Sequence, residues 1–188
     1  MKTSNLFIIV CVFWIVTEIL LQFLCRSKND SQDKDLGSVK RLNLVIYTSV
    51  IVGIFISFTQ YGHININHYL IQLSGLILIL LGLVVRWVAI LTLRRFFTVN
   101  VAIQTDHIII QTGIYKYIRH PSYLGMLISF FGLGIRVSNL ISIIVLLIPI
   151  TFVLVNRIQI EERALNDTFG NDYLEYCKET WKLIPWVY

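Results

Sequence analysis

The polar side chains that could carry chemistry gather in two short segments of an otherwise apolar chain. The first segment contains the run Arg119-His120-Pro121-Ser122-Tyr123, and the second contains Arg157 and Glu161. Residues four apart lie on one face of a helix, so Arg157 and Glu161 would project together. A guanidinium can hold a carboxylate by two parallel hydrogen bonds, and a carboxylate suits an ammonium group. The alternative is that the two charges only neutralise each other close to hydrocarbon.

The first segment has the features of a helix start. Pro121 has no backbone N–H and suits the first turn of a helix, where the exposed N–H groups could meet an anionic group. Gly125 follows at a position where a missing side chain permits close helix packing. The spacing alone fits a second interpretation equally well, a basic loop that anchors a helical hairpin to lipid headgroups.

Metal and thiol chemistry find little support in the sequence. His63 and His68 are five residues apart, whereas a helical metal site uses a spacing of four. The three cysteines lie far apart and none forms a metal-type pair: Cys11, Cys25 and Cys177. We therefore predict no metal site.

The composition shows what kind of chain must position these residues. Of the 188 residues, 56% are hydrophobic and only 14% are charged, and the mean hydropathy is +0.71. Soluble domains carry about a quarter charged residues, and disordered chains are poor in apolar ones, so neither class fits. The net charge of +5 is better explained by cytoplasmic loops of a membrane protein than by a nucleic-acid partner, and we expect no nucleic acid.

Apolar runs indicate an all-α integral membrane protein. A helix needs about 20 apolar residues to cross a bilayer. Three runs approach or exceed that length: 6–24, 42–58 and 69–93. A fourth stretch, 122–155, is too long for one span and is broken at Arg136, which favours a helical hairpin. Its first arm, 122–135, would be only ~21 Å long. We predict about five transmembrane helices, with the three helices of 1–93 and a second region of 94–188, which holds the hairpin and the cytoplasmic tail, forming one integrated unit.

The basic residues predict the orientation of these helices. Thirteen of the 16 Lys and Arg residues fall in alternate loops, within segments 26–41, 94–119 and 157–182. The positive-inside rule places these segments in the cytoplasm, with the N-terminus outside and the C-terminus inside. The membrane would be the plasma membrane of a bacterium or archaeon, or the endoplasmic reticulum of a eukaryote. Two charges lie within the spans: we expect Glu18 to contact a neighbouring helix and Arg86 to reach the cytoplasmic surface.

From Phe96 onward the chain resembles the isoprenylcysteine carboxyl methyltransferase (ICMT) family, small membrane enzymes that use S-adenosylmethionine. The resemblance follows the family order over about half of the chain. The matching pieces are Phe96-Phe97-Thr98, Gln104, His107 to Gly113 with Tyr115, Arg119-His120-Pro121-Ser122-Tyr123-Leu124-Gly125, Glu161-Glu162-Arg163-Ala164-Leu165, Phe169-Gly170-Asn171-Asp172-Tyr173-Leu174-Glu175-Tyr176 and Ile184-Pro185. The resemblance implies that 94–188 is the catalytic methyltransferase region.

The resemblance implies roles for individual residues. It implies that S-adenosylmethionine is held by Gln104, His107, Ile108, Ile109, Ile110, Tyr115, His120, Pro121, Ser122, Tyr123 and Glu161. Arg157 would bind and orient the carboxylate of a prenylcysteine-like substrate that enters from the membrane, and membrane lipids would surround the chain. Methyl transfer to a carboxylate requires alignment and exclusion of water rather than a general base. The sequence does not indicate which oligomeric state the protein adopts.

Three other functions remain open at this stage. The acceptor could be a phospholipid or another lipid-like molecule. The chain could be an NADPH-dependent membrane reductase, although such enzymes typically carry an acidic residue after the glycine of this motif, where Gly125 is followed by Met126. It could also be a non-catalytic membrane partner protein, which would tolerate changes at His120 and Glu161.

Overall fold

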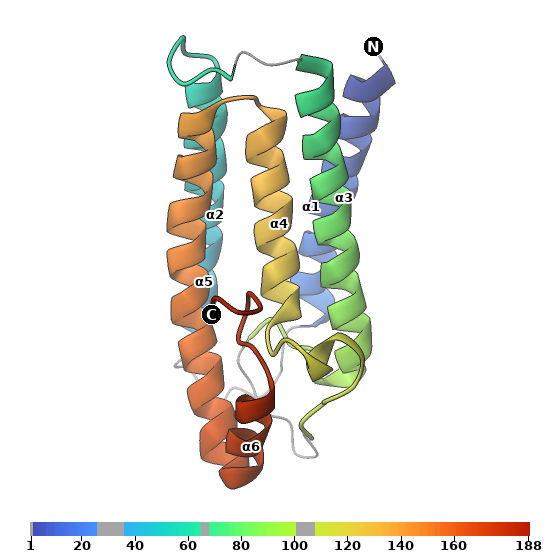
Figure 1. The fold of residues 1–188 in the computed structure, drawn as a ribbon, viewed down its shortest axis with the longest axis vertical. Helices are drawn as coiled ribbons and strands as arrows, with labels where there is room; N and C mark the ends of the chain where they lie inside the picture. The colour runs from blue at the N-terminus through green and yellow to red at the C-terminus, as the bar shows by residue number, and fades with distance from the viewer. Residues whose placement is uncertain (1, 26–35, 65–67, 101–107) are drawn as a thin grey trace.

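The computed structural model describes residues 2–25, 36–64, 68–100 and 108–188. In these ranges the regular secondary structure is entirely helical (Figure 1). The elements, in chain order, are α1 (Lys2–Leu24), α2 (Leu36–Ser57), α3 (His68–Leu93), the short 3-10 helices η1 (Arg94–Phe96) and η2 (Gly113–Lys116), α4 (Pro121–Arg136), α5 (Leu140–Phe169) and α6 (Asn171–Glu179).

The described helices confirm an all-α membrane fold. Four of them, α1, α2, α3 and α5, are long and apolar enough to cross a bilayer. The expected hairpin is present, since α4 ends at Arg136 and α5 begins at Leu140. With 16 residues, α4 is ~24 Å long and falls short of the ~30 Å hydrocarbon core. The predicted five spans therefore correspond to four full-length helices and one shorter arm.

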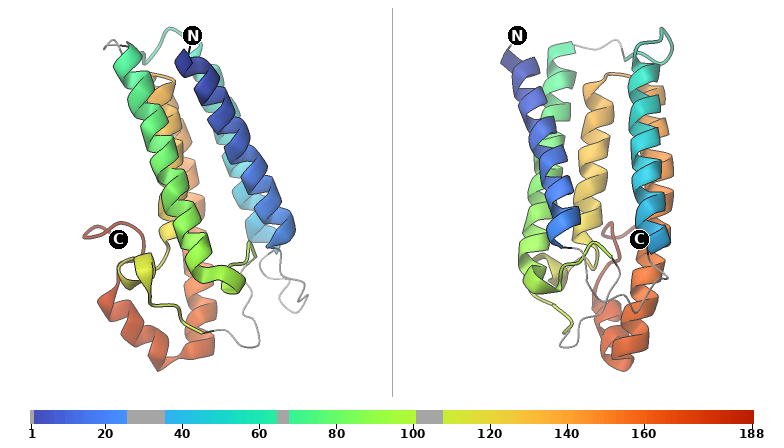
Figure 2. Two further views of the ribbon diagram at one scale, coloured as in Figure 1. Left: turned by 90° about the vertical axis from the view of Figure 1, so that its right-hand side faces the viewer. Right: turned by 180° about the vertical axis from the view of Figure 1, so that it is seen from behind.

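The helices form one bundle, and a different set of helices makes up each of its two sides (Figures 1 and 2). On one side α3 packs against α4 and also contacts α1, and on the other side α2 packs against α5. Contacts between α4 and α5 join the two sides. Helix α5 continues beyond the ends of the other helices, and α6 turns back there towards the bundle (Figure 1).

Helices α3 and α4 approach each other along a seam of glycines. The seam consists of Gly75 and Gly82 on α3 and Gly125 and Gly132 on α4. A Cβ atom at any of these four positions would lie 2.5–2.7 Å from a backbone atom of the opposite helix. Small residues let membrane helices pack backbone to backbone, so the seam fixes the position of α4 against α3. The close approach predicted for Gly125 is confirmed.

The turn between α4 and α5 is held by Asn139. Its side-chain oxygen accepts a hydrogen bond from the Ser142 backbone N–H at 3.0 Å, which caps the start of α5. Its side-chain nitrogen donates to the carbonyl of Tyr61 at 2.8 Å. The Ser142 hydroxyl also donates to the carbonyl of Gly53 on α2 at 2.8 Å. This end of the hairpin is therefore tied to α2 and to the loop that follows it.

An ion pair joins α1 to α3 within the bundle. Two nitrogens of the Arg86 guanidinium donate to the two carboxylate oxygens of Glu18, at 2.5 and 2.7 Å. A third nitrogen donates to the Ser122 hydroxyl at 2.8 Å. The contact expected for Glu18 is confirmed. The surface position expected for Arg86 is wrong: the residue is 6% exposed, because an acidic partner on another helix lies within reach of its side chain.

Candidate cofactor and substrate site

A pocket lies at the end of the bundle where α4 begins and α5 leaves it. One wall is formed by the start of α4 and the last turns of α5, and another by residues 96–100 and 108–110. Tyr115 of η2 and two tyrosines of α6, Tyr173 and Tyr176, close the remaining side. The Tyr176 hydroxyl donates to the carbonyl of Tyr115 at 2.7 Å, so α6 and η2 are held together.

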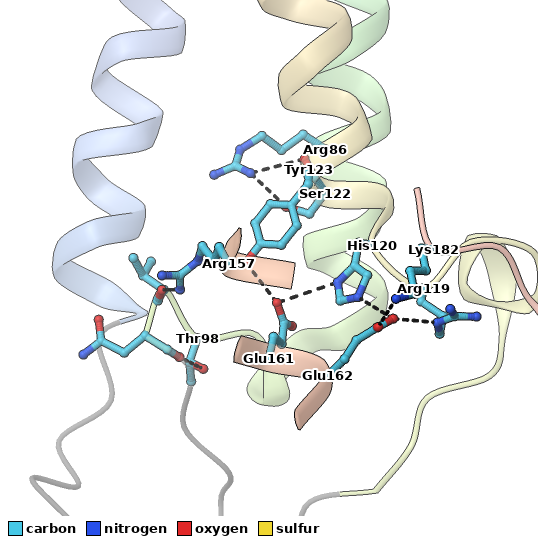
Figure 3. Close-up of polar contacts among 12 residues, drawn as sticks. Arg86, Thr98, Arg119, His120, Ser122, Tyr123, Arg157, Glu161, Glu162 and Lys182 are labelled. Atoms are coloured by element: carbon cyan, nitrogen blue, oxygen red, sulfur yellow. Dashed lines mark hydrogen bonds and ion pairs between the residues drawn. The ribbon is translucent and has the colours of Figure 1, made fainter. Parts of the chain in front are cut away.

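Arg157 of α5 is the centre of one group of contacts (Figure 3). The residue is only 4% exposed. Its Nε donates to the Tyr123 hydroxyl at 2.9 Å, its Nη1 donates to the Ser38 hydroxyl at 2.7 Å, and its Nη2 donates to the carbonyl of Val99. One guanidinium thus joins α5 to α2, to α4 and to the segment after η1.

The Tyr123 hydroxyl connects Arg157 to Glu161. It accepts from Arg157 and donates to Oε2 of Glu161 at 3.0 Å (Figure 3). The predicted proximity of Arg157 and Glu161 is therefore observed, with a phenol between them. Nδ1 of His120 lies 3.7 Å from the same Glu161 oxygen, and the His120 ring stacks on Tyr123 with centroids 5.7 Å apart. The Glu161 side chain is 33% exposed and faces the pocket, so its carboxylate is accessible to a ligand.

Glu162, the next residue on α5, is the centre of a second group of charges. Its carboxylate lies 3.0 Å from Nε of Arg119 and 2.8 Å from Nζ of Lys182. The hydrogen bond to Glu162 raises the pKa of the Lys182 ammonium above its ordinary value. Arg119 also donates to the Thr180 hydroxyl at 3.0 Å. These contacts attach the segment after α6 to the start of α4.

The segment after α6 also pairs with the site through its backbone. Trp181 N–H donates to the Tyr117 carbonyl at 3.0 Å, and Arg119 N–H donates to the Trp181 carbonyl at 2.8 Å. His120 N–H then donates to the Lys182 carbonyl at 3.0 Å. The backbone that leads to His120 is therefore held by three hydrogen bonds before α4 begins.

Two residues of the pocket carry a buried polar atom that has no hydrogen bond within the part of the chain that the structure describes. These atoms are the Tyr173 hydroxyl and Nε2 of His120, and a Glu162 oxygen lies 3.5 Å from this Nε2. Buried polar atoms are nearly always paired, so an unpaired one at the wall of a pocket indicates a place for a ligand or water.

Most of the residues predicted from the sequence lie together. Nine of them line the pocket: Ile108, Ile109, Ile110, Tyr115, His120, Ser122, Tyr123, Arg157 and Glu161. Pro121 is the first residue of α4, as predicted, and is buried behind the pocket wall rather than lining it. Gln104 and His107 lie outside the described residues.

The pocket also contains residues that the sequence did not single out as binding residues. The family motifs quoted above include Phe97, Arg119 and Tyr173, but the resemblance assigned no binding role to these three residues. Tyr176 follows Tyr173 by three residues, which places both on one face of α6. Asn100 lies in no recognisable motif, and only the fold brings it to the pocket.

Comparisons with known proteins agree with this arrangement. The family model described as "Isoprenylcysteine carboxyl methyltransferase (ICMT) family" matches residues 75–167, which include α4 and most of α3 and α5. Protein-S-isoprenylcysteine O-methyltransferases A and B of Arabidopsis thaliana are 34% and 35% identical over 123 residues, which cover 64% of this chain and 62% of each relative. The enzyme of the same name from Saccharomyces cerevisiae is 30% identical over 115 residues, 60% of this chain and 48% of the relative.

A solved structure shares the fold. It is described as the eukaryotic intramembrane Ras methyltransferase ICMT, and it superposes with a TM-score of 0.63 at 26% sequence identity, covering 79% of this chain and 53% of the other. The chain thus spans about 62% of the length of the Arabidopsis relatives and less of the others named here. The order of the motifs, the matched segment and the shared fold lead to one conclusion: the chain belongs to the isoprenylcysteine carboxyl methyltransferase family.

Proposed function

We propose that the protein is a membrane methyltransferase that transfers a methyl group from S-adenosylmethionine to the carboxylate of a prenylcysteine-like substrate. One observation carries this proposal. Arg157 and Glu161, a cation for a carboxylate and an anion for an ammonium group, face one pocket and share the Tyr123 hydroxyl. The pocket lies at the end of the bundle where α4 begins and α5 leaves it.

The residues of the pocket fit the cofactor. The accessible carboxylate of Glu161 suits the ammonium group of S-adenosylmethionine, and the unpaired Nε2 of His120 offers a polar contact. Ile108, Ile109, Ile110 and Tyr115 supply apolar surface, and we assign Gln104 and His107 to the same site on the resemblance alone. Bound there, the cofactor would supply a methyl group activated by a positively charged sulfur.

Arg157 would hold the acceptor. In the structure its donors reach neutral oxygens of Tyr123, Ser38 and Val99. A substrate carboxylate that replaces the Ser38 and Val99 contacts would exchange neutral acceptors for a charged one, which binds a guanidinium more strongly. The carboxylate is ionised at neutral pH and needs no base, so the task of Arg157 is orientation.

Tyr115, which lines the pocket, is not suited to proton transfer. Burial, with the charge of Glu161 as the next contribution, raises the pKa of the Tyr115 phenol well above its ordinary value. The group stays protonated across the physiological range and contributes surface and shape. The apolar walls exclude water from the reacting groups, which is the other requirement of the transfer.

The site end of the bundle would face the cytoplasm, where the cofactor is dissolved. Arg119, Lys178 and Lys182 lie at this end, and the positive-inside rule puts such loops in the cytoplasm. The hydrophobic part of the acceptor would then approach from the lipid. The N-terminus of the protein would lie outside. The membrane would be the plasma membrane of a prokaryote or the endoplasmic reticulum of a eukaryote.

Cofactor binding tests the proposal directly. S-adenosylmethionine and S-adenosylhomocysteine are titrated into the detergent-purified protein and into Glu161→Gln and His120→Ala. We expect saturable binding to the wild type and weaker binding to both variants. Glu175→Gln removes an exposed carboxylate of α6 that is absent from the pocket lining and should bind as the wild type does. A folded wild-type protein that binds neither compound would contradict the proposal.

An acceptor screen separates the remaining functions. Prenylcysteine analogues should be methylated in preference to phospholipids and other lipid-like molecules, because Arg157 suits an anionic acceptor better than an amine. Binding of NADPH in place of the two cofactors would indicate a reductase, and binding of none would leave a non-catalytic partner protein. The comparisons favour neither of these.

A further inference from the structure

The ion pair between α1 and α3 reaches the pocket through a third contact. Glu18 of α1 accepts two hydrogen bonds from the Arg86 guanidinium of α3, at 2.5 and 2.7 Å. The remaining nitrogen of Arg86 donates to the Ser122 hydroxyl at 2.8 Å, and Ser122 lines the pocket (Figure 3). A side chain on α1 is therefore connected to the first turn of α4 by one guanidinium.

Charged groups within a membrane bundle are costly unless they are paired. Two donors of Arg86 would be enough to neutralise Glu18 and hold α1 against α3. The third donor does something different: it fixes the Ser122 side chain one residue before Tyr123, whose hydroxyl holds Glu161. Arg86 is also packed directly against α4, because its backbone nitrogen would lie 2.6 Å from a Cβ atom at Gly125.

We propose that Glu18 and Arg86 are positioning residues that set Ser122 and the first turn of α4 for cofactor binding. This inference rests on the proposed function. It makes α1 part of the binding machinery, although α1 lies outside residues 75–167, the segment that matches the family model. Glu18 neutralises and orients the guanidinium of Arg86, and this guanidinium orients the Ser122 side chain.

The bundle contains its own reporter for the docking of α1. Trp14 lies one helical turn before Glu18, and its ring packs against Phe130 of α4 with centroids 5.0 Å apart. With the three other tryptophans replaced by phenylalanine, the emission of Trp14 reports whether α1 still lies against α4. The replaced residues are Trp87, Trp181 and Trp186. This readout needs no cofactor.

The experiment separates positioning from folding by three variants. Glu18→Gln removes the charge that neutralises Arg86. Arg86→Lys keeps a positive charge opposite Glu18 but lacks the planar fork that reaches both Glu18 and Ser122. The exchanged pair, Glu18→Arg with Arg86→Glu, restores the charge pair between α1 and α3 without a guanidinium on α3. Lys178→Gln breaks an exposed pair on α6 and serves as the control. The dissociation constant of S-adenosylhomocysteine, the thermal midpoint and the Trp14 emission are measured for each.

We expect Arg86→Lys to bind S-adenosylhomocysteine roughly tenfold more weakly, the loss that corresponds to one charged hydrogen bond. Its Trp14 emission and thermal midpoint should stay close to those of the wild type. The exchanged pair should restore the thermal midpoint that Glu18→Gln lowers. It should not restore the affinity for S-adenosylhomocysteine. The control should change neither.

Two results would overturn the inference while leaving the proposed function intact. One is wild-type affinity in Arg86→Lys, and the other is recovery of both affinity and thermal midpoint by the exchanged pair, which would reduce the ion pair to a folding contact. A wild-type protein that binds no S-adenosylhomocysteine would instead contradict the proposed function, and this inference would fall with it.

Discussion

The Tyr123 hydroxyl lies between two opposite charges that the proposed ligands need separately. It accepts from Arg157 and donates to Glu161, so the two side chains are held apart rather than paired with each other. A direct ion pair would satisfy both groups and leave neither for a ligand. The phenol instead links a cation and an anion that both line the same pocket.

Tyr123→Phe tests this role of the hydroxyl. We expect the dissociation constant of S-adenosylhomocysteine to rise about tenfold, because Glu161 loses the hydrogen bond that orients it. Unfolding free energy should fall by about 1–3 kcal/mol, because the change removes both the hydrogen bond to Glu161 and the one from Arg157. Isothermal titration and thermal unfolding measure the two effects. An unchanged dissociation constant would show that Glu161 needs no support from Tyr123.

Arg157→Lys tests the orientation of the acceptor. Lysine keeps the charge but cannot make two parallel hydrogen bonds to a carboxylate. We expect kcat/KM for a prenylcysteine analogue to fall by about ten- to a hundredfold, with cofactor affinity nearly unchanged. Steady-state kinetics and cofactor titration on the same preparation measure both. Normal turnover of Arg157→Ala at saturating substrate would remove Arg157 from the mechanism.

At the scale of the elements, the glycine seam determines where α4 lies. The backbones of α3 and α4 touch at four positions, so α4 has no freedom to slide along α3. The start of α4 carries two residues that line the pocket, Ser122 and Tyr123, and the seam therefore sets their position relative to α3. A shorter helix is acceptable for this purpose, because α4 needs to reach α3 and the pocket rather than both membrane surfaces.

Gly82→Ala tests the seam. The added Cβ would lie 2.5 Å from the Gly125 carbonyl oxygen, so the helices must separate. We expect a loss of about 1–3 kcal/mol in unfolding free energy, as for other overpacked sites, and weaker cofactor binding because α4 moves. Gly37→Ala on α2 is the matched control, since nothing lies within 4 Å of its Cβ position. Equal stability of the two variants would show that the seam tolerates expansion.

Local spacing in the sequence predicted some of these elements and could not predict others. Arg157 and Glu161 were found because one helix places them on one face, and the start of α4 at Pro121 follows from proline geometry. The partner of Arg86 was missed because Glu18 is 68 residues away and no pattern in either helix relates them. Asn100 was missed for the same reason, as its position in the pocket depends on tertiary packing alone.

At the scale of the whole molecule, the segment after α6 completes the site from the far end of the chain. Its backbone pairs with residues 117–120, and its Lys182 side chain joins Arg119 at Glu162. This pairing uses main-chain groups, which carry no residue-specific signal, and it could not be predicted from the sequence. The site thus draws on α2, α4, α5 and this last segment together.

Glu162→Gln tests the attachment of the last segment. Loss of the negative charge removes the ion pairs to Arg119 and Lys182, so we expect faster tryptic cleavage after Lys178 and Lys182. High pH should have a similar effect on the wild type. The raised pKa of Lys182 means that its contribution to stability is present below the ordinary lysine pKa and is lost as the pH rises through the raised value. Equal cleavage rates in the variant and wild type would contradict the attachment.

The backbone pairing of residues 181 and 182 with residues 117–120 also has a consequence for biosynthesis. A chain that is still on the ribosome can insert α1 to α5 and close the glycine seam, yet residues 117–120 lack their backbone partners until Lys182 has been added. We therefore expect nascent and prematurely terminated chains to bind the proposed cofactor more weakly than the full chain, even when their membrane helices are assembled. The end of translation would then set the moment at which the site is fully held.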